Sequence, residues 1–117
     1  QVFEVIPYLR ISEPEISVIG RKVVAKFKLE QVTSNEVYRI SLFAHSHIDV
    51  SNKLNIVNRT EELNRSITDG EAFELSINLE DYTSTLVPGK SYYFRIGAQS
   101  HGSETKYNYS ASVQLDI

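Results

Sequence analysis

The chain has 117 residues, of which 41% are hydrophobic, and its 12 basic and 15 acidic side chains give a net charge of −3. This length predicts one domain with a single core, and the scattered charges form no basic stripe of the kind that binds nucleic acid. The chain has no cysteine, which excludes disulfides and thiolate metal sites. No apolar run approaches the roughly 20 residues that cross a bilayer, so we expect no membrane span.

The first stretch, residues 2–11, is largely apolar but contains Pro7, which cannot donate to a β-ladder. It therefore predicts an edge segment or an incoming connection rather than a central strand. We assign residues 1–10 to this segment, which arrives from a preceding domain or forms an edge strand, and residues 11–117 to the main domain. A short first strand is expected over residues 16–19, ended by Gly20.

Apolar and polar side chains alternate with a period of two along most of the remaining chain, which indicates strands with one buried face. The alternation is clearest in residues 23–31, 37–47, 73–79 and 92–99. The side chains expected to face the core are Val23, Ala25, Phe27, Leu29, Tyr38, Ile40, Leu42, Ala44, Phe73, Leu75, Ile77, Leu79, Tyr92, Phe94, Ile96, Ala98, Ala111, Val113, Leu115 and Ile117.

Residues 49–70 lack a clear period. Leu54, Ile56 and Val57 indicate a short edge strand, and the sequence Thr60-Glu-Glu-Leu63 resembles a helix-capping signal. A short helical turn therefore stays open as an alternative in this part of the chain.

Pro88 and Gly89 predict a turn, because proline presets φ at one turn position and glycine accepts the positive φ that follows. Tyr92 is the first inward residue after it, where a tyrosine can return its hydroxyl to the preceding loop, as in the tyrosine corner of Greek-key sandwiches. About seven strands without a clear helix predict an all-β, immunoglobulin-like antiparallel β-sandwich.

Residues 86–98, reading Leu-Val-Pro-Gly-Lys-Ser-Tyr-Tyr-Phe-Arg-Ile-Gly-Ala, followed by Gly102 and Tyr109-Ser110, resemble the second half of a fibronectin type III domain. The first half departs from that family, since Phe27 stands at or near the place of the usual tryptophan. This resemblance implies a fibronectin type III-like sandwich.

Three segments resemble the C-terminal domain of a family of uncharacterised Bacteroidetes lipoproteins linked to polysaccharide-utilisation systems. They are Phe3-Glu-Val-Ile-Pro7-Tyr8, the strand from Lys22 to Leu29, and Lys106-Tyr-Asn-Tyr-Ser110. The resemblance implies a transthyretin-like domain and a lipid anchor upstream. It also implies a location at the cell surface, on the outer membrane, or in the periplasm, and a non-catalytic role near glycan capture.

Phe43 and Tyr93 point outward if the alternation holds, flanked by Arg39, Arg95 and His45. Exposed aromatic rings beside arginine form interface hot spots and sugar-stacking platforms. A cross-strand aromatic pair that only stabilises the sheet is the simpler alternative.

The polar loop over residues 100–106 contains His101 and leads to Tyr107 and Tyr109. Binding residues are often mounted on loops at the ends of a sandwich, although an ordinary solvated hairpin loop would have the same composition. The candidate ligand-binding residues are Phe43, Tyr93, Arg95, His101, Tyr107 and Tyr109.

His45, His47 and Asp49 would share one face of an extended strand. The outer two lie about 13 Å apart at the usual rise per residue, so we expect no metal site and no other cofactor. The carboxylate pairs Glu61-Glu62 and Glu80-Asp81 are sequence neighbours in loop-like stretches, unlike the separated acid and base of a glycosidase. No nucleophile elbow, phosphate loop or zinc-protease motif is present, and we predict no enzyme activity.

The sequence thus predicts a non-catalytic accessory domain of a cell-surface lipoprotein that supports glycan binding or uptake, either by binding or as a spacer. The alternative is a docking module whose outward sheet face, around Phe43 and Tyr93, binds a partner protein. The expected partners are an oligosaccharide or a neighbouring surface protein. A flat apolar patch larger than a few hundred Å² would favour docking, and an aromatic-lined depression would favour glycan.

Overall fold

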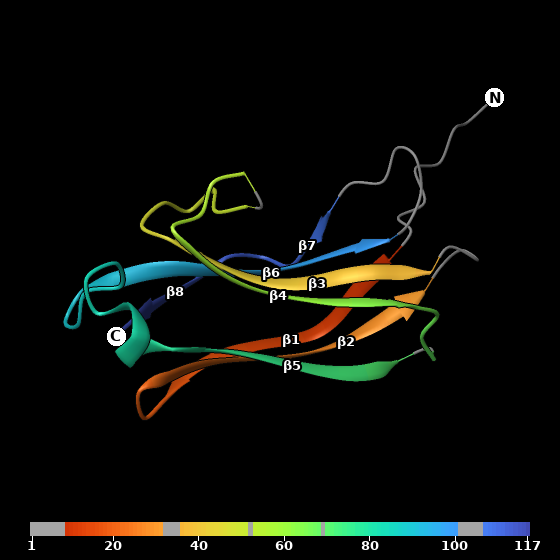
Figure 1. The fold of residues 1–117 in the computed structure, drawn as a ribbon, viewed down its shortest axis with the longest axis horizontal. Coiled ribbons are helices and arrows are strands. Elements are labelled where there is room, and N and C mark those ends of the chain that lie inside the picture. Colours follow the sequence, from red (N-terminus) through yellow and green to blue (C-terminus); the bar gives the residue numbers. More distant parts are fainter. Residues whose placement is uncertain (1–8, 32–35, 52, 69, 101–106) are drawn as a thin grey trace.

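The computed structural model describes residues 9–31, 36–51, 53–68, 70–100 and 107–117. These residues form two facing antiparallel sheets, which confirms the predicted β-sandwich (Figure 1). The described elements, in chain order, are β1 (Leu9–Ile19), β2 (Lys22–Gln31), β3 (Val37–His45), β4 (Val57–Arg65), β5 (Glu71–Asn78), the 3-10 helix η1 (Leu79–Tyr82), β6 (Ser91–Ser100), β7 (Asn108–Tyr109) and β8 (Val113–Asp116). The described part of the chain contains no apolar helix of the length that a bilayer crossing requires.

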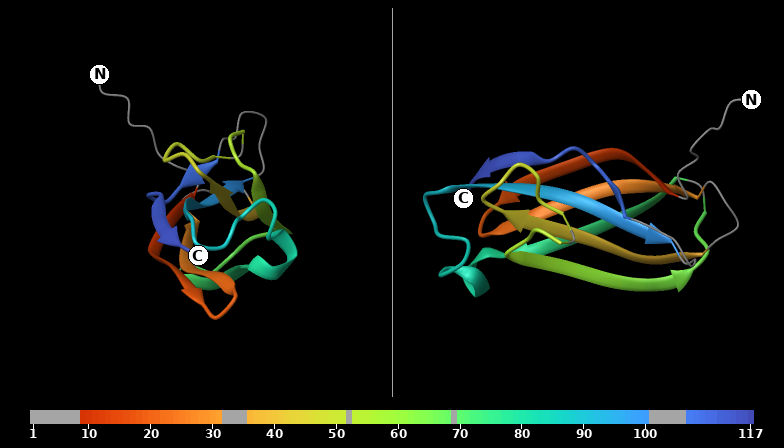
Figure 2. Two further views of the ribbon diagram at one scale, coloured as in Figure 1. Left: turned by 90° about the vertical axis from the view of Figure 1, so that its left-hand side faces the viewer. Right: turned by 90° about the horizontal axis from the view of Figure 1, so that it is seen from above.

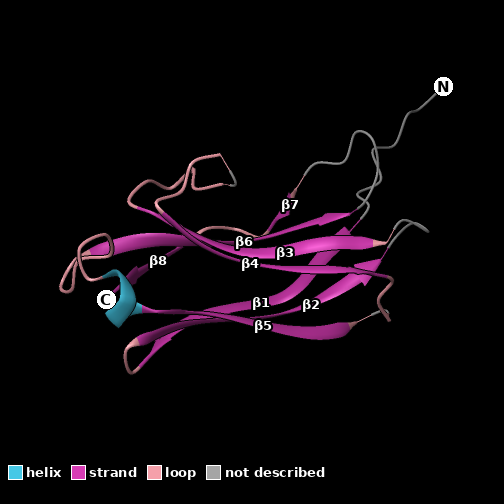
Figure 3. Cartoon of the chain, in the orientation of Figure 1, coloured by secondary structure: helices cyan, strands magenta, loops and turns pink. Residues whose placement is uncertain are grey.

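One sheet has the strand order β1-β2-β5, and the other has the order β4-β3-β6-β7, with β8 also paired to β6. Figure 2 shows the two layers from one end and from above, with β4 along one long side. The short helix η1 lies at the end of the sandwich where β5 ends (Figure 3). Neither sheet closes on itself, so β4 and β5 are both edge strands.

The core lies between the sheets and contains most of the side chains expected there. The expected residues that are buried are Val23, Ala25, Phe27, Leu29, Ile40, Leu42, Ala44, Leu75, Ile77, Leu79, Tyr92, Phe94, Ile96 and Ala98. Four more, which are half-buried and pack against this core, are Phe73, Val113, Leu115 and Ile117.

Two expected core residues are placed elsewhere. The pairing of β3 shifts register between Val37 and Arg39, so Val37 is fully buried and Tyr38 only half-buried. Ala111 is exposed, because the last strand is not continuous. Ser110 interrupts it, since its hydroxyl accepts the buried N–H of Ile96 at 3.1 Å.

The first strand is longer than expected, because β1 already begins at Leu9. It forms an edge of its sheet, and of the segment predicted as an edge or an incoming connection, residues 2–11, only residues 9–11 are described. The pairing is irregular between Ser12 and Glu15, where Glu13 has φ of 49°. An irregularity on an edge strand accommodates Pro14, which has no N–H to donate. Residues 1–8, including Pro7, lie outside the described residues.

The middle of the chain forms the nine-residue edge strand β4, and residues 60–63 are strand rather than a helical turn. An edge strand was expected here around Leu54, Ile56 and Val57, but the observed strand begins at Val57 and is longer than expected. Its alternation is weak because Val57 and Leu63 face the core, while Arg59 and Glu61 share that face and are exposed.

The tyrosine corner is confirmed. The backbone N–H of Val87 donates to the hydroxyl of Tyr92 at 2.9 Å, and Gly89 has the positive φ, 86°, that the turn requires. The helix η1 was not expected. The side chain of Asn78 caps it by accepting the N–H of Glu80 at 3.1 Å.

Candidate functional site

On the outer face of the second sheet, the rings of Phe43, Tyr107 and Tyr109 contact one another in a group that we call the tyrosine cluster. Phe43 points outward from β3 as expected, but it is only 3% exposed. Its ring centroid lies 5.5 Å from that of Tyr107 and 6.2 Å from that of Tyr109, and the two tyrosine rings stack at 5.7 Å. The expected exposed platform is therefore partly covered by the two residues that were expected to extend it.

Gly97 on β6 allows the rings to lie on the sheet. A Cβ atom at this position would lie 2.8 Å from Phe43 Cε2, 2.9 Å from Tyr107 Cδ1 and 3.2 Å from Tyr109 Cε1. The lack of a side chain here lets the rings of the last segment approach the backbone of β6.

Two arginines contact the tyrosine rings. The guanidinium of Arg95 lies 4.6 Å from the ring centroid of Tyr109, and that of Arg39 lies 5.3 Å from that of Tyr107. Both distances are in the range of cation–π attraction. Arg95 also donates to the carbonyl of Ser110 at 2.7 Å. The cluster therefore fastens the last segment of the chain across β6 to β3.

Tyr93 lies on the same outer face but pairs with His45 on β3, whereas Phe43 pairs with Arg95. The aromatic partners of Phe43 are thus the two tyrosines of the last segment, not Tyr93. His101 lies outside the described residues. The assignment of ligand binding to these residues stays a prediction.

His45, His47 and Asp49 do not converge on one point. The Nδ1 atoms of His45 and His47 accept the backbone N–H groups of His47 and Asp49 at 3.0 and 3.1 Å. The Nδ1 atom of His47 also lies 3.7 Å from the Asp49 carboxylate, a contact that is an ion pair only with a protonated imidazole. Within the described ranges, no three His, Cys, Asp or Glu side chains are grouped to hold a metal ion.

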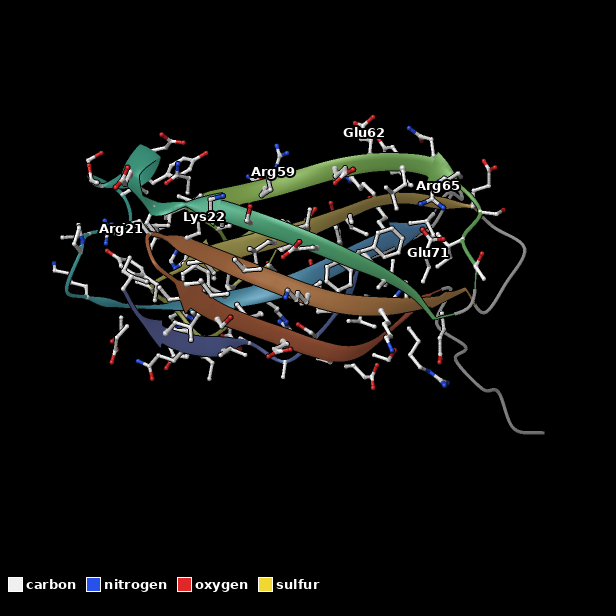
Figure 4. All side chains as sticks on the ribbon, turned by 90° about the horizontal axis from the view of Figure 1, so that it is seen from below. Arg21, Lys22, Arg59, Glu62, Arg65 and Glu71 are labelled. Atoms are coloured by element: carbon white, nitrogen blue, oxygen red, sulfur yellow. The ribbon has the colours of Figure 1, made fainter. Side chains whose placement is uncertain are left out.

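A second candidate surface lies on the open side of the sandwich between the edge strands β4 and β5 (Figure 4). At one end of this side, Arg65 donates from Nη1 and Nη2 to the two carboxylate oxygens of Glu71 at 3.1 and 2.5 Å. This contact holds the pKa of Glu71 below its ordinary value. It also links the two sheets.

Toward the other end of this side, a hollow of about 310 Å³ opens between the strands, which we call the edge groove. Its lining comes from β2, β4, β5 and η1, and Figure 4 shows Lys22 and Arg59 on this part of the open side. The lining residues are Lys22, Asn58, Arg59, Ser76, Ile77, Asn78, Asp81 and Tyr82.

Within the described part of the chain, the structure shows no hydrogen bond or ion pair made by the side chains of Lys22, Arg59, Asp81 and Tyr82. Tyr82 is 37% exposed. The groove therefore combines two cations, a carboxylate and a phenol whose polar groups are available to a ligand.

A larger hollow of about 520 Å³ lies over the outer face of β1, β2 and β5. Its charges serve the sheet itself, because Lys26 lies opposite both Glu15 and Glu74, and Lys28 pairs with Glu13 at 2.8 Å. Opposite charges in neighbouring strands stabilise a sheet in this way. This hollow is the weaker candidate for a ligand site.

The edge groove was not predicted from the sequence. Its residues come from four separate elements, and none belongs to a motif. The one available signal is Arg59, a charged residue on the inward face of an edge strand. Finding it requires the register of β4, which the weak alternation of that strand does not provide.

Comparison with known proteins places the chain in a family. A family model described as "Domain of unknown function (DUF3823_C)" matches residues 9–114, whereas no curated protein sequence matches. A crystal structure from Bacteroides uniformis, named "putative carbohydrate binding protein", is 30% identical with a TM-score of 0.89, and the match covers 98% of this chain and 60% of that one.

Two further crystal structures have the same fold. A DUF3823 family protein from Parabacteroides merdae is 22% identical with a TM-score of 0.77, over 94% of this chain and 53% of that one. One from Bacteroides ovatus is 18% identical with a TM-score of 0.76, over 94% and 56%. This chain thus spans between 53% and 60% of the length of these proteins. Since the family model covers nearly all of its described sandwich, the chain belongs to the DUF3823_C domain family.

Proposed function

We propose that this chain is a non-catalytic carbohydrate-binding domain and that it binds glycan in the edge groove. The observation that carries the proposal is the set of unpartnered polar groups on Lys22, Arg59 and Asp81 beside the exposed ring of Tyr82. A sugar offers hydroxyl groups that both donate and accept hydrogen bonds. The groove supplies an acceptor in the carboxylate and donors in the two cations.

The volume of the edge groove and the ring of Tyr82 also suit a saccharide. Ligand pockets begin at about 300 Å³, so a hollow of about 310 Å³ fits one or two sugar units. An aromatic side chain offers large apolar contact area at low entropic cost. The ring of Tyr82 can therefore pack against the C–H face of a pyranose while its hydroxyl hydrogen-bonds.

The comparisons support this proposal. The Bacteroides uniformis protein is named for carbohydrate binding and matches 98% of this chain at 30% identity. The non-catalytic part of the proposal rests on the sequence, which has no nucleophile elbow, phosphate loop or zinc-protease motif.

The setting of the domain is also a proposal. We propose that it lies at the cell surface or in the periplasm, as a fibronectin type III-like part of a polysaccharide-utilisation lipoprotein, and the resemblance of residues 3–8, 22–29 and 106–110 to Bacteroidetes lipoproteins supports this. The matched crystal structures come from Bacteroides and Parabacteroides, which supports that setting.

Docking of a partner protein on the outer face of β3 and β6 stays an alternative prediction. Docking favours a flat apolar patch, whereas guanidinium groups lie against the rings of the tyrosine cluster. Exposed apolar side chains lie instead on the loop beside this face, at Ile48, Leu54 and Ile56.

The test is a titration of the domain with neutral and acidic oligosaccharides, followed by NMR chemical shifts. We expect saturable shifts around η1 and the start of β2. Asp81→Asn should weaken binding at least tenfold. Glu62→Gln is the matched control, because it removes the same charge from the outer face of β4. If no saccharide of the panel binds, or if both variants bind like the wild type, the proposal is wrong.

A further inference from the structure

We propose that the edge groove selects an acidic saccharide, one whose sugar unit carries a carboxylate, as in a hexuronic acid. This inference rests on the proposed function and names its ligand class. It follows from the position of two cations, Lys22 and Arg59, and one carboxylate, Asp81, around one hollow.

The charge of the groove is positive although the net charge of the whole chain is −3. Three other basic side chains are already engaged, since Arg65 pairs with Glu71, Lys28 with Glu13 and Arg10 with Glu30. The two cations of the groove have no such partner within the described residues. A ligand with one carboxylate would neutralise the excess positive charge.

Arg59 is placed to meet a ligand at the mouth of the groove. It lies opposite Leu42, a fully buried residue, and two residues after Val57, which is 4% exposed. Its stem therefore starts on the core face of β4, and its charged end must leave through the open side. The guanidinium fork can bind both oxygens of a carboxylate.

The opposite wall is held by backbone pairing. Lys22 lies opposite Asn78 in the β2–β5 ladder, and Asn78 caps η1 through the N–H of Glu80. This cap positions Asp81 and Tyr82, which follow it in η1. Lys22, Asp81 and Tyr82 are thus fixed to the same end of the sheet.

The mixture of charges argues against a polyanion. Nucleic acids and polyphosphates are bound by several cations that neutralise several phosphates, and Asp81 would repel such a chain. A hydroxyl-rich ligand with a single carboxylate per unit uses all of the groups: the cations bind the carboxylate, and Asp81 accepts from the hydroxyls.

A purely protective role of Arg59 makes a different prediction. Inward-pointing charges on edge strands prevent pairing with another chain. That role needs a positive charge but not the two parallel N–H donors of a guanidinium group. Arg59→Lys would then behave like the wild type in every assay, whereas a bidentate contact to a carboxylate should be weakened by the same change.

The experiment compares two probes by isothermal titration calorimetry. One is a linear trisaccharide that contains a single hexuronic acid unit, and the other is the same trisaccharide with that carboxyl group reduced to a primary alcohol. We expect the acidic probe to bind at least tenfold tighter than the reduced probe. Because the contact is charge-assisted, its affinity should fall as salt is raised from 50 to 500 mM.

Variants locate the effect. Arg59→Lys and Lys22→Gln should each weaken the acidic probe about tenfold and leave the reduced probe unchanged. Lys26→Gln is the matched control, because Lys26 lies on β2 like Lys22 but opposite Glu15 and Glu74. It should change the affinity for neither probe. Circular dichroism establishes that each variant is folded.

The outcomes separate the two proposals. Equal affinity for the two probes would overturn the acidic selectivity and leave carbohydrate binding intact. Failure of both probes, together with the neutral oligosaccharides, would overturn both. Tight binding of the acidic probe that neither Arg59→Lys nor Lys22→Gln weakens would overturn the assignment to the edge groove.

Discussion

Gly97 lies beneath the tyrosine cluster, and its replacement by alanine should destabilise the domain. The new Cβ would lie 2.8 Å from Phe43 Cε2 and 2.9 Å from Tyr107 Cδ1, closer than the 3.0 Å below which Cβ contacts essentially never occur. Phe43 is 3% exposed and has little room to retreat. Tyr107 is half-buried, so it should swing outward and lose its contact with Phe43.

Opposing effects decide whether Gly97→Ala stabilises or destabilises the domain. Alanine restricts the unfolded chain more than glycine, which stabilises a strand by about 0.5–1 kcal/mol. Overpacking costs about 1–3 kcal/mol, and losing the edge-on contact between Phe43 and Tyr107 costs about 0.5–1.5 kcal/mol more. The steric cost is larger, so Gly97→Ala should lower the free energy of unfolding by about 1–3 kcal/mol.

Urea unfolding followed by far-UV circular dichroism measures this change, since the chain has no tryptophan. The control is the same substitution in a Tyr107→Ala background, where Phe43 can turn into the vacated space. There Gly97→Ala should cost at least about 1 kcal/mol less, because contacting residues couple by about that amount. A Gly97→Ala variant as stable as the wild type would refute the packing of the rings on Gly97.

Two further predictions concern single contacts. Tyr92→Phe should destabilise the domain by about 1–2 kcal/mol, because the N–H of Val87 loses its acceptor. The control is Tyr93→Phe, which removes a hydroxyl with no partner among the described residues and should cost less than about 0.5 kcal/mol. If Tyr92→Phe and Tyr93→Phe lower the melting temperature equally, the tyrosine corner is contradicted. Glu71 has a lowered pKa because Arg65 donates to it, so below its ordinary pKa of about 4.3 the unfolded chain binds more protons than the folded one. The stabilising contribution of Glu71 is present above that pH and is lost as the pH falls through the lowered pKa. The measurement is the urea midpoint of the wild type and of Glu71→Gln between pH 7 and 2. If the two midpoints change with pH in parallel, this prediction is contradicted.

Alternation identified the inward faces of β2 and β6 from the sequence. In residues 23–29 and 92–98, every second side chain is buried as expected. These strands lie inside their sheets, with paired neighbours on both sides, so the local period reflects burial directly. The corner at Tyr92 was also predictable, because proline and glycine turn chemistry acts over a few residues.

Prediction failed where long-range contacts decide the outcome. The irregular pairing between Val37 and Arg39 moves Tyr38 away from the core. The edge strand β4 has one paired side only, so polar residues are tolerated on both of its faces and its period is obscured. In each case the neighbouring strand, rather than the local sequence, determines which side chain is buried.

The sequence by itself determined the β-sandwich, the inward faces of its central strands and the tyrosine corner, because alternation and turn chemistry are local properties of the chain. Only the tertiary structure decided that Phe43 is covered and that Lys22, Arg59 and Asp81 line one groove. The exposure of an outward side chain depends on which distant segment lies over it. A groove between two edge strands exists only once both sheets have assembled.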